Sequence, residues 1–148
     1  MTKINIKEFE VTRNKNRGIN KEWTLCEYYG IHREKHDGIP YNEGSDIEIN
    51  GMNISVKSPG ASLMSGGYCI GCKTFEGIWR RYRKNTHSDT FVFITHDFDA
   101  YFMDIDEFSK FIHKFATLAH ESSCHRGDLK IRFRDNKAMV KYLEEKVA

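Results

Sequence analysis

The sequence lacks any long hydrophobic run, and its apolar stretches fall far short of the ~18–20 residues that a membrane-spanning helix needs. The first ten residues carry charges and none of the apolar segment typical of a secretory leader. Proline and cysteine are scarce, at two and four residues, and a 148-residue chain is long enough to fold without disulfides. These absences predict a single cytoplasmic domain over residues 1–148, with no membrane partner.

A strong excess of charge of one sign is also absent, because 23 Lys and Arg residues face 21 Asp and Glu residues, giving a net charge of +2. The charges are nevertheless segregated along the chain. Basic residues predominate at 73–84 and at 130–146, whereas 88–107 contains acids and no Lys or Arg. A segregated field can attract a polyanion even when the sum is small. Ordinary solvated surfaces give similar charge runs, so both interpretations stay open.

Hydrophobic periodicity predicts helices that alternate with strands. The expected helices lie at 20–29 with Asn20 as N-cap, from Phe75 through Tyr82, from an Asp106 cap through Leu118 and Ala119, and at 137–147. The expected strands lie at 45–49, 52–57, 90–95, 100–105 and 129–134. No repeat, low-complexity tract or linker divides the chain. The order predicts an α/β fold, a single domain in which helices flank a mixed central β-sheet.

The dipeptide Asn50-Gly51 between two alternating segments is the strongest short-range signal for a β-hairpin. A two-residue turn pairs Glu48 with Asn53 and Asp46 with Ser55. The apolar face, expected in the core, carries Ile47, Ile49, Met52, Ile54 and Val56; the polar face, expected in water, carries Asp46, Glu48, Asn53, Ser55 and Lys57. Asp46 and Lys57 then lie within reach of one small ligand, or form a plain cross-strand ion pair.

At these residues the sequence resembles the PD-(D/E)xK nuclease superfamily, particularly small type II restriction endonucleases. The resemblance covers residues 22–95 and is carried by Asn42-Glu43-Gly44-Ser45-Asp46, by the hairpin, and by Ile54-Ser55-Val56-Lys57-Ser58. It implies a restriction-endonuclease-like fold in which Asp46 holds Mg²⁺, with Mn²⁺ as a substitute, and Lys57 orients or activates the attacking water. It also implies a bacterial or phage-encoded homodimer that acts on double-stranded DNA.

The sequence departs from the family pattern at Ser55, where a second metal-binding carboxylate is usual and a hydroxyl carries no charge for a hard cation. Similar restriction enzymes with Ser-Val-Lys supply the acid from the next helix, which makes Glu76 the first candidate here. Glu76 could instead form an i,i+4 ion pair with Arg80. Further candidate acids are Glu27, Glu43 and Glu48. A third reading is that Ser55 disables the site.

Two groups of residues after the hairpin are candidates for DNA contacts. Cations that would hold phosphates are Lys73, Arg80, Arg81, Arg83 and Lys84, with Arg132 and Arg134 as an extension. The loop with Gly66-Gly67 could enter a groove through Ser62, Ser65 and Tyr68, or be a plain surface connector.

Cys69 and Cys72 have the spacing of zinc ligands, and His120 with Cys124 or His125 could complete a structural zinc site. Because no second Cys-x-x-Cys is present, free thiols are the expected state of an intracellular chain.

The sequence therefore predicts a Mg²⁺-dependent DNA endonuclease, a type II restriction enzyme, with Asp46, Lys57 and Glu76 at its centre. Phosphodiester hydrolysis needs an activated water and neutralisation of charge on the phosphate, for which carboxylate-held Mg²⁺ and an ammonium group are suited. Alternatives are a phage-type or junction-resolving nuclease of the same superfamily, and a catalytically silent nucleic-acid-binding module with a structural zinc.

Overall fold

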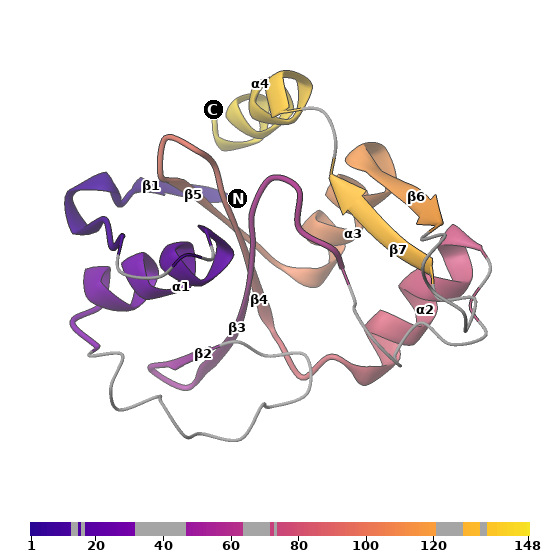
Figure 1. The fold of residues 1–148 in the computed structure, drawn as a ribbon, viewed down its shortest axis with the longest axis horizontal. Helices are drawn as coiled ribbons and strands as arrows, with labels where there is room; N and C mark the ends of the chain where they lie inside the picture. The colour runs from indigo at the N-terminus through magenta and orange to yellow at the C-terminus, as the bar shows by residue number, and fades with distance from the viewer. Residues whose placement is uncertain are drawn as a thin grey trace.

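The computed structural model describes residues 1–12, 15, 17–31, 47–63, 72, 74–120, 129–133 and 136–148 (Figure 1). A five-stranded sheet in the order β1-β5-β4-β3-β2 forms its centre. The strands are β1 (Thr2–Asn5), β2 (Ile47–Ile49), β3 (Met52–Lys57), β4 (Thr90–Ile94) and β5 (Asp99–Met103). β3 and β4 run parallel and the other neighbours antiparallel, so the sheet is mixed, as the sequence predicted.

The predicted hairpin is confirmed with its register, because Ile47 pairs with Ile54, Glu48 with Asn53 and Ile49 with Met52. Asn50 and Gly51 have φ angles of 50° and 80°. Positive φ at both central residues is the geometry of the tight turn whose twist matches the two strands, and Asn-Gly adopts it at low cost.

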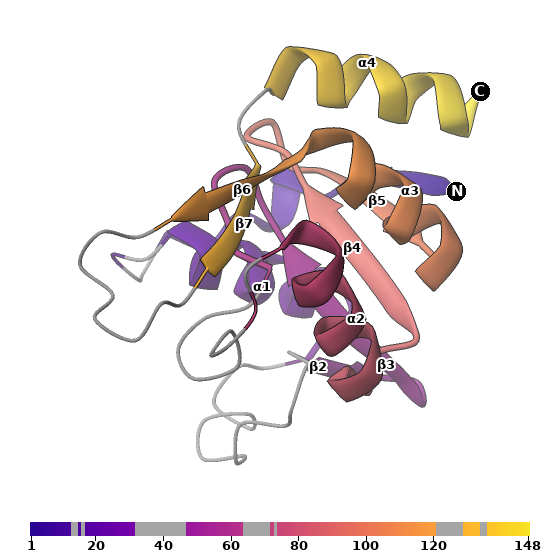
Figure 2. The same ribbon diagram turned by 90° about the vertical axis from the view of Figure 1, so that its right-hand side faces the viewer.

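Helices cover both faces of the sheet, which confirms the α/β class (Figures 1 and 2). α1 (Arg17–Tyr28), with the short 3₁₀ turn η1 (Lys7–Phe9), covers one face. α2 (Phe75–Asn85), α3 (Ile105–Phe115) and α4 (Asn136–Val147) cover the other. No helix within the described part of the chain is long and apolar enough to span a bilayer.

Each face has its own apolar core. On the α1 face, Leu25 and Cys26 pack with Ile54 and the other inward residues of the hairpin. On the opposite face, Tyr82 of α2 and Phe108 of α3 pack on the sheet, and the rings of Phe108 and Phe91 stack at 4.4 Å. The predicted stripe of α2 is confirmed, since Ile78, Trp79 and Tyr82 are buried, and the Thr74 side chain caps the helix by accepting from Gly77 N–H.

α1 begins at Arg17, before the predicted Asn20 cap instead of after it. Asn20 lies inside the helix, where its carbonyl accepts a bond of 2.7 Å from the Thr24 hydroxyl. Gly18, a poor helix former, hid the first turn from the periodicity. The predicted end is confirmed: Gly30 has φ of 72° and terminates the helix.

The prediction of a long helix from Asp106 through Ala119 is wrong at both ends. Asp104 is the N-cap and forms a capping box with Glu107, and the helix ends at Phe115. Residues 116–120 instead form β6 (Ala116–His120), which pairs antiparallel with β7 (Leu129–Phe133) in a separate two-stranded sheet. Leu118 is therefore 41% exposed and outside the core stripe, because strand pairing overrides a helical apolar spacing that continues for one more turn.

Candidate active site

Lys57 lies at the carboxyl end of β3 and is half-buried on the face covered by α2. Its Nζ donates to the carbonyl oxygens of Ser62 and Leu63, at 3.4 and 3.2 Å. The ammonium also lies 5.9 Å from the centre of the Tyr82 ring. The structure thus brings together two residues singled out in the sequence, Lys57 and Ser62, and adds Tyr82 to them.

Ser55 shares this face but does not face water as the sequence predicted, because its exposed fraction is only 3%. Its hydroxyl lies 3.5 Å from the hydroxyl of Tyr82, at hydrogen-bonding distance. The expectation of a wet polar face failed because α2 packs over this part of β3, which sequence alternation in the hairpin cannot reveal. Two residues from Lys57, the neutral Ser55 is therefore part of a small buried polar group with Tyr82.

Glu76, the first candidate for the missing acid, contacts α3. Its Oε1 lies 2.7 Å from Nε2 of His113, and the Nδ1 of the same ring lies 2.7 Å from the carbonyl of Ser109. Glu76 thus joins α2 to α3 in this structure, in place of the Arg80 pair considered in the sequence.

The other candidate acids within the described residues lie away from Lys57. Glu48 is exposed and pairs with Asn53, near the turn end of the hairpin, whereas Lys57 ends the strand. Glu27 lies on α1, which covers the opposite face of the sheet. Within the ranges that the structure describes, no three His, Cys, Asp or Glu side chains come together as a metal site.

Several predicted site residues lie outside the described residues: Asp46, Glu43, Ser65, Tyr68, Lys73, Cys69, Cys124, His125 and Arg134. The side chains of His120 and Arg132 lie outside them as well. Of the proposed zinc ligands only Cys72 is described in full. It is 6% exposed, and its Sγ lies 3.8 Å from the carbonyl of Gly77.

The basic residues of α2 lie on its outer side. Arg80, Arg83 and Lys84 are exposed, and Arg81 is half-buried. Arg83 lies 4.0 Å from Asp106 on α3, an ion pair with both side chains more than half exposed. Asp106 belongs to the acidic segment at 88–107, so part of that segment lies beside the basic helix, because α2 and α3 lie side by side.

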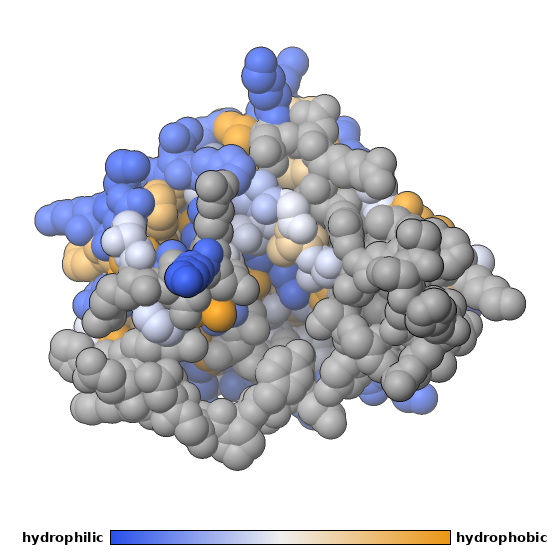
Figure 3. Space-filling model, in the orientation of Figure 1, coloured by the Kyte–Doolittle hydropathy of each residue, from blue (hydrophilic) through white to orange (hydrophobic). Residues whose placement is uncertain are grey.

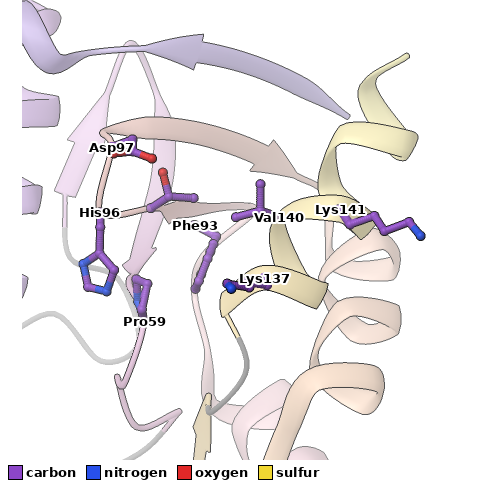
Figure 4. Close-up of a pocket in the computed structure, with 8 residues that line it drawn as sticks. Pro59, Phe93, His96, Asp97, Lys137, Val140 and Lys141 are labelled. Atoms are coloured by element: carbon purple, nitrogen blue, oxygen red, sulfur yellow. The ribbon is translucent and has the colours of Figure 1, made fainter.

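A pocket of about 420 Å³ opens near the carboxyl ends of β3 and β4 (Figure 4). Its wall includes Phe93, whose backbone partner across the parallel ladder is Lys57. The pocket could not be predicted from the sequence, because its other wall is α4. The spacing of Lys137, Val140 and Lys141 places them on one helix face, and this spacing was the sequence pattern that could have indicated the pocket wall.

α4 is held over this end of the sheet by a charged cluster. Glu144 accepts from Lys3 Nζ and from the Tyr101 hydroxyl, each at 2.5 Å. The hydrogen bond from Lys3, followed by that from Tyr101, lowers the pKa of the Glu144 carboxyl. Burial and the bond to Glu144 raise the pKa of Tyr101, and the bond to Glu144 raises that of Lys3. The cluster joins α4 to β1 and β5.

Comparisons of the chain with protein-family models, with curated proteins and with solved structures gave no match.

Proposed function

We propose that this chain is a Mg²⁺-dependent DNA endonuclease, a homodimeric type II restriction enzyme whose catalytic lysine is Lys57. The observation that carries the proposal is the position of Lys57. It ends a central strand beside a parallel neighbour, with its ammonium positioned by the carbonyls of Ser62 and Leu63. The carboxyl ends of parallel strands are where α/β sheets most often bind ligands. The segment Ile54-Ser55-Val56-Lys57 also resembles the second motif of PD-(D/E)xK nucleases.

The described residues can supply part of the chemistry of phosphodiester hydrolysis. The Lys57 ammonium can donate to a phosphate oxygen and stabilise the charge that develops there. The exposed Arg80 and Lys84 on α2 can contact neighbouring phosphates, which orients DNA without reading its sequence. A bound Mg²⁺ would polarise the phosphate and lower the pKa of a bound water.

The described residues do not by themselves fit a Mg²⁺ ion. Among them the only acid on the Lys57 face of the hairpin is Glu48 of β2. It is exposed and pairs with Asn53, near the end of β3 that is remote from Lys57. The proposed ion therefore depends on Asp46, and on Glu43 or Glu76 as a second carboxylate. Asp46 directly precedes β2. The observed pairing of Ile47 with Ile54 has the predicted register, and continuing this register by one residue predicts Asp46 opposite Ser55.

Digestion of supercoiled plasmid DNA with and without Mg²⁺ tests the proposal. We expect discrete fragments that require Mg²⁺ and disappear with Asp46→Ala, while Lys110→Ala, an exposed position on α3, cuts like the wild type. Titration calorimetry with Mn²⁺ adds a readout independent of cutting, since Asp46→Ala should also lose metal binding. Activity confined to a four-way junction would favour a resolving nuclease. Inertness of the wild type on duplex, branched and single-stranded DNA would contradict the proposal.

A second candidate function is a catalytically silent module that binds nucleic acid. Two observations favour it: the residue at the usual acidic position, Ser55, is neutral and buried, and Glu76 is bonded to His113. Such a module would shift a DNA duplex in a gel, with an affinity that falls as salt rises, and would leave it uncut in Mg²⁺ and in Mn²⁺.

A further inference from the structure

The pocket beside Lys57 has an apolar interior. Pro59, Phe93 and Val140 line it from the segment after β3, from β4 and from α4 (Figure 4). Its volume of about 420 Å³ lies in the range of cavities that take small organic ligands, roughly 300–1,000 Å³. An apolar lining of this size favours a ligand with an apolar body over a bare inorganic ion.

Polar groups lie on two opposite sides of this interior. On the α4 side, the exposed Lys137 points toward Phe93, and Lys141 contributes its stem while its ammonium points away (Figure 4). On the other side, the turn between β4 and β5 presents His96 and Asp97, both exposed. A cation thus lies across the pocket from a carboxylate, which suits a ligand with an anionic group at one end and hydrogen-bond donors at the other.

The walls of the pocket are positioned by hydrogen bonds of their own. In the turn, the Phe98 N–H donates to the carbonyl of Thr95 at 3.0 Å and the Asp99 N–H to the Thr95 hydroxyl at 3.2 Å. The opposite wall, α4, is joined to the sheet through Glu144 and Tyr101. The pocket is therefore formed without a ligand, which lowers the entropic cost of binding.

We propose that this pocket binds a deoxynucleoside monophosphate, with the phosphate at Lys137, the base against Val140 and Pro59, and the 3′-hydroxyl of the sugar toward Asp97. The choice of a nucleotide rests on the proposed function, which brings DNA to this end of the sheet. Because Lys57 pairs with Phe93 in the ladder, the pocket lies next to the proposed catalytic residue. It would hold the nucleotide at the free 3′ end of a DNA strand, where the sugar keeps a hydroxyl that can donate to Asp97.

Titration calorimetry of the full chain with dTMP, thymidine and inorganic phosphate, in EDTA, tests the inference. We expect dTMP to bind more tightly than either fragment, because thymidine lacks the phosphate that Lys137 would bind and inorganic phosphate lacks the base and the sugar. Lys137→Gln should weaken dTMP about tenfold or more by removing a charge-assisted bond. Val140→Phe should abolish binding by filling the interior. Lys110→Gln is the matched control for loss of a surface charge and should bind like the wild type.

The outcomes separate this inference from the nuclease proposal. Absence of dTMP binding, or dTMP binding that survives both Lys137→Gln and Val140→Phe, overturns the pocket assignment even if plasmid DNA is cut. Phosphate binding equal to that of dTMP shows a simple anion site and also overturns it. dTMP binding that is lost in Lys137→Gln supports it even if the wild type cuts no DNA, and in that case only the nuclease proposal fails. Circular dichroism of each variant checks that it is folded.

Discussion

The two faces of β3 differ although both are covered by helices. Toward α1, Ile54 and Val56 are buried in an apolar core, with exposed fractions of 0% and 8%. Toward α2, the same strand places Ser55, 3% exposed, against Tyr82, and Lys57 beside two carbonyls. Buried polar groups add little to stability even when they are hydrogen-bonded. The difference indicates that the α1 face stabilises the strand, whereas the α2 face carries its polar side chains.

The largest effect on stability should come from the α1 face. Ile54→Ala removes a fully buried side chain from the centre of that core and should lower the free energy of unfolding by about 2–5 kcal/mol. Urea denaturation followed by circular dichroism measures it. A loss no larger than that of Ser55→Ala would remove the contrast between the faces.

The α2 face should respond weakly by comparison. Ser55→Ala and Tyr82→Phe each remove one hydroxyl of a 3.5 Å pair and should cost about 1 kcal/mol or less. A double-mutant cycle of the two in urea should show coupling, because either change removes the same contact. Strictly additive losses would mean that the two hydroxyls act separately.

The contact between α2 and α3 allows a test of whether Glu76 only bonds to His113 or is also the second carboxylate of the proposed site. Since Glu76 and His113 are at least one-third exposed, Glu76→Gln and His113→Gln should each cost only about 0.5 kcal/mol. If Glu76 serves only this contact, both variants cut plasmid DNA alike. Cutting that is lost in Glu76→Gln and kept in His113→Gln would identify Glu76 as the second carboxylate.

The smallest effect is expected at Glu144, which is half-buried and joins α4 to the sheet. Hydrogen bonds from Lys3 and Tyr101 lower its pKa from the ordinary value of 4.5. A carboxyl with a lowered folded-state pKa stabilises the fold above pH 4.5, and this contribution disappears as pH falls through the folded-state pKa. The melting temperature of the wild type should therefore be higher than that of Glu144→Gln at neutral pH, and this difference should disappear as the pH falls. A difference in melting temperature that does not change with pH would contradict this account.

The sequence was sufficient for features determined by near neighbours. Asn50-Gly51 determined the turn and the register, and the spacing from Phe75 to Tyr82 determined the buried side of α2. Features that depend on distant partners were missed. The 116–120 segment has a helical apolar pattern but forms a strand because it pairs with β7. β1 is a short, mostly exposed edge strand, and its pairing with β5 is what defines it as a strand.

The candidate site divides in the same way. Lys57 could be selected from the sequence as a site residue. Its bond to the Ser62 carbonyl could not be predicted, because the sequence predicted Ser62 only as a DNA contact. Tyr82 could not be selected from the sequence as a site residue, because the contact of its hydroxyl with Ser55 joins a strand to a helix 27 positions further along the chain. The pocket joins the end of β4 to α4, and no local pattern indicates that these meet.

The central claim, that the α2 face of β3 carries a nuclease site, is tested most directly by Lys57→Met. The rate of Mg²⁺-dependent plasmid cleavage should be compared between this variant, wild type and Lys110→Met. We predict a loss of at least about a hundredfold for Lys57→Met, the range seen when a group that stabilises developing charge is removed. Its urea midpoint should stay close to that of the wild type. Cleavage by a folded Lys57→Met variant at the wild-type rate would contradict the claim.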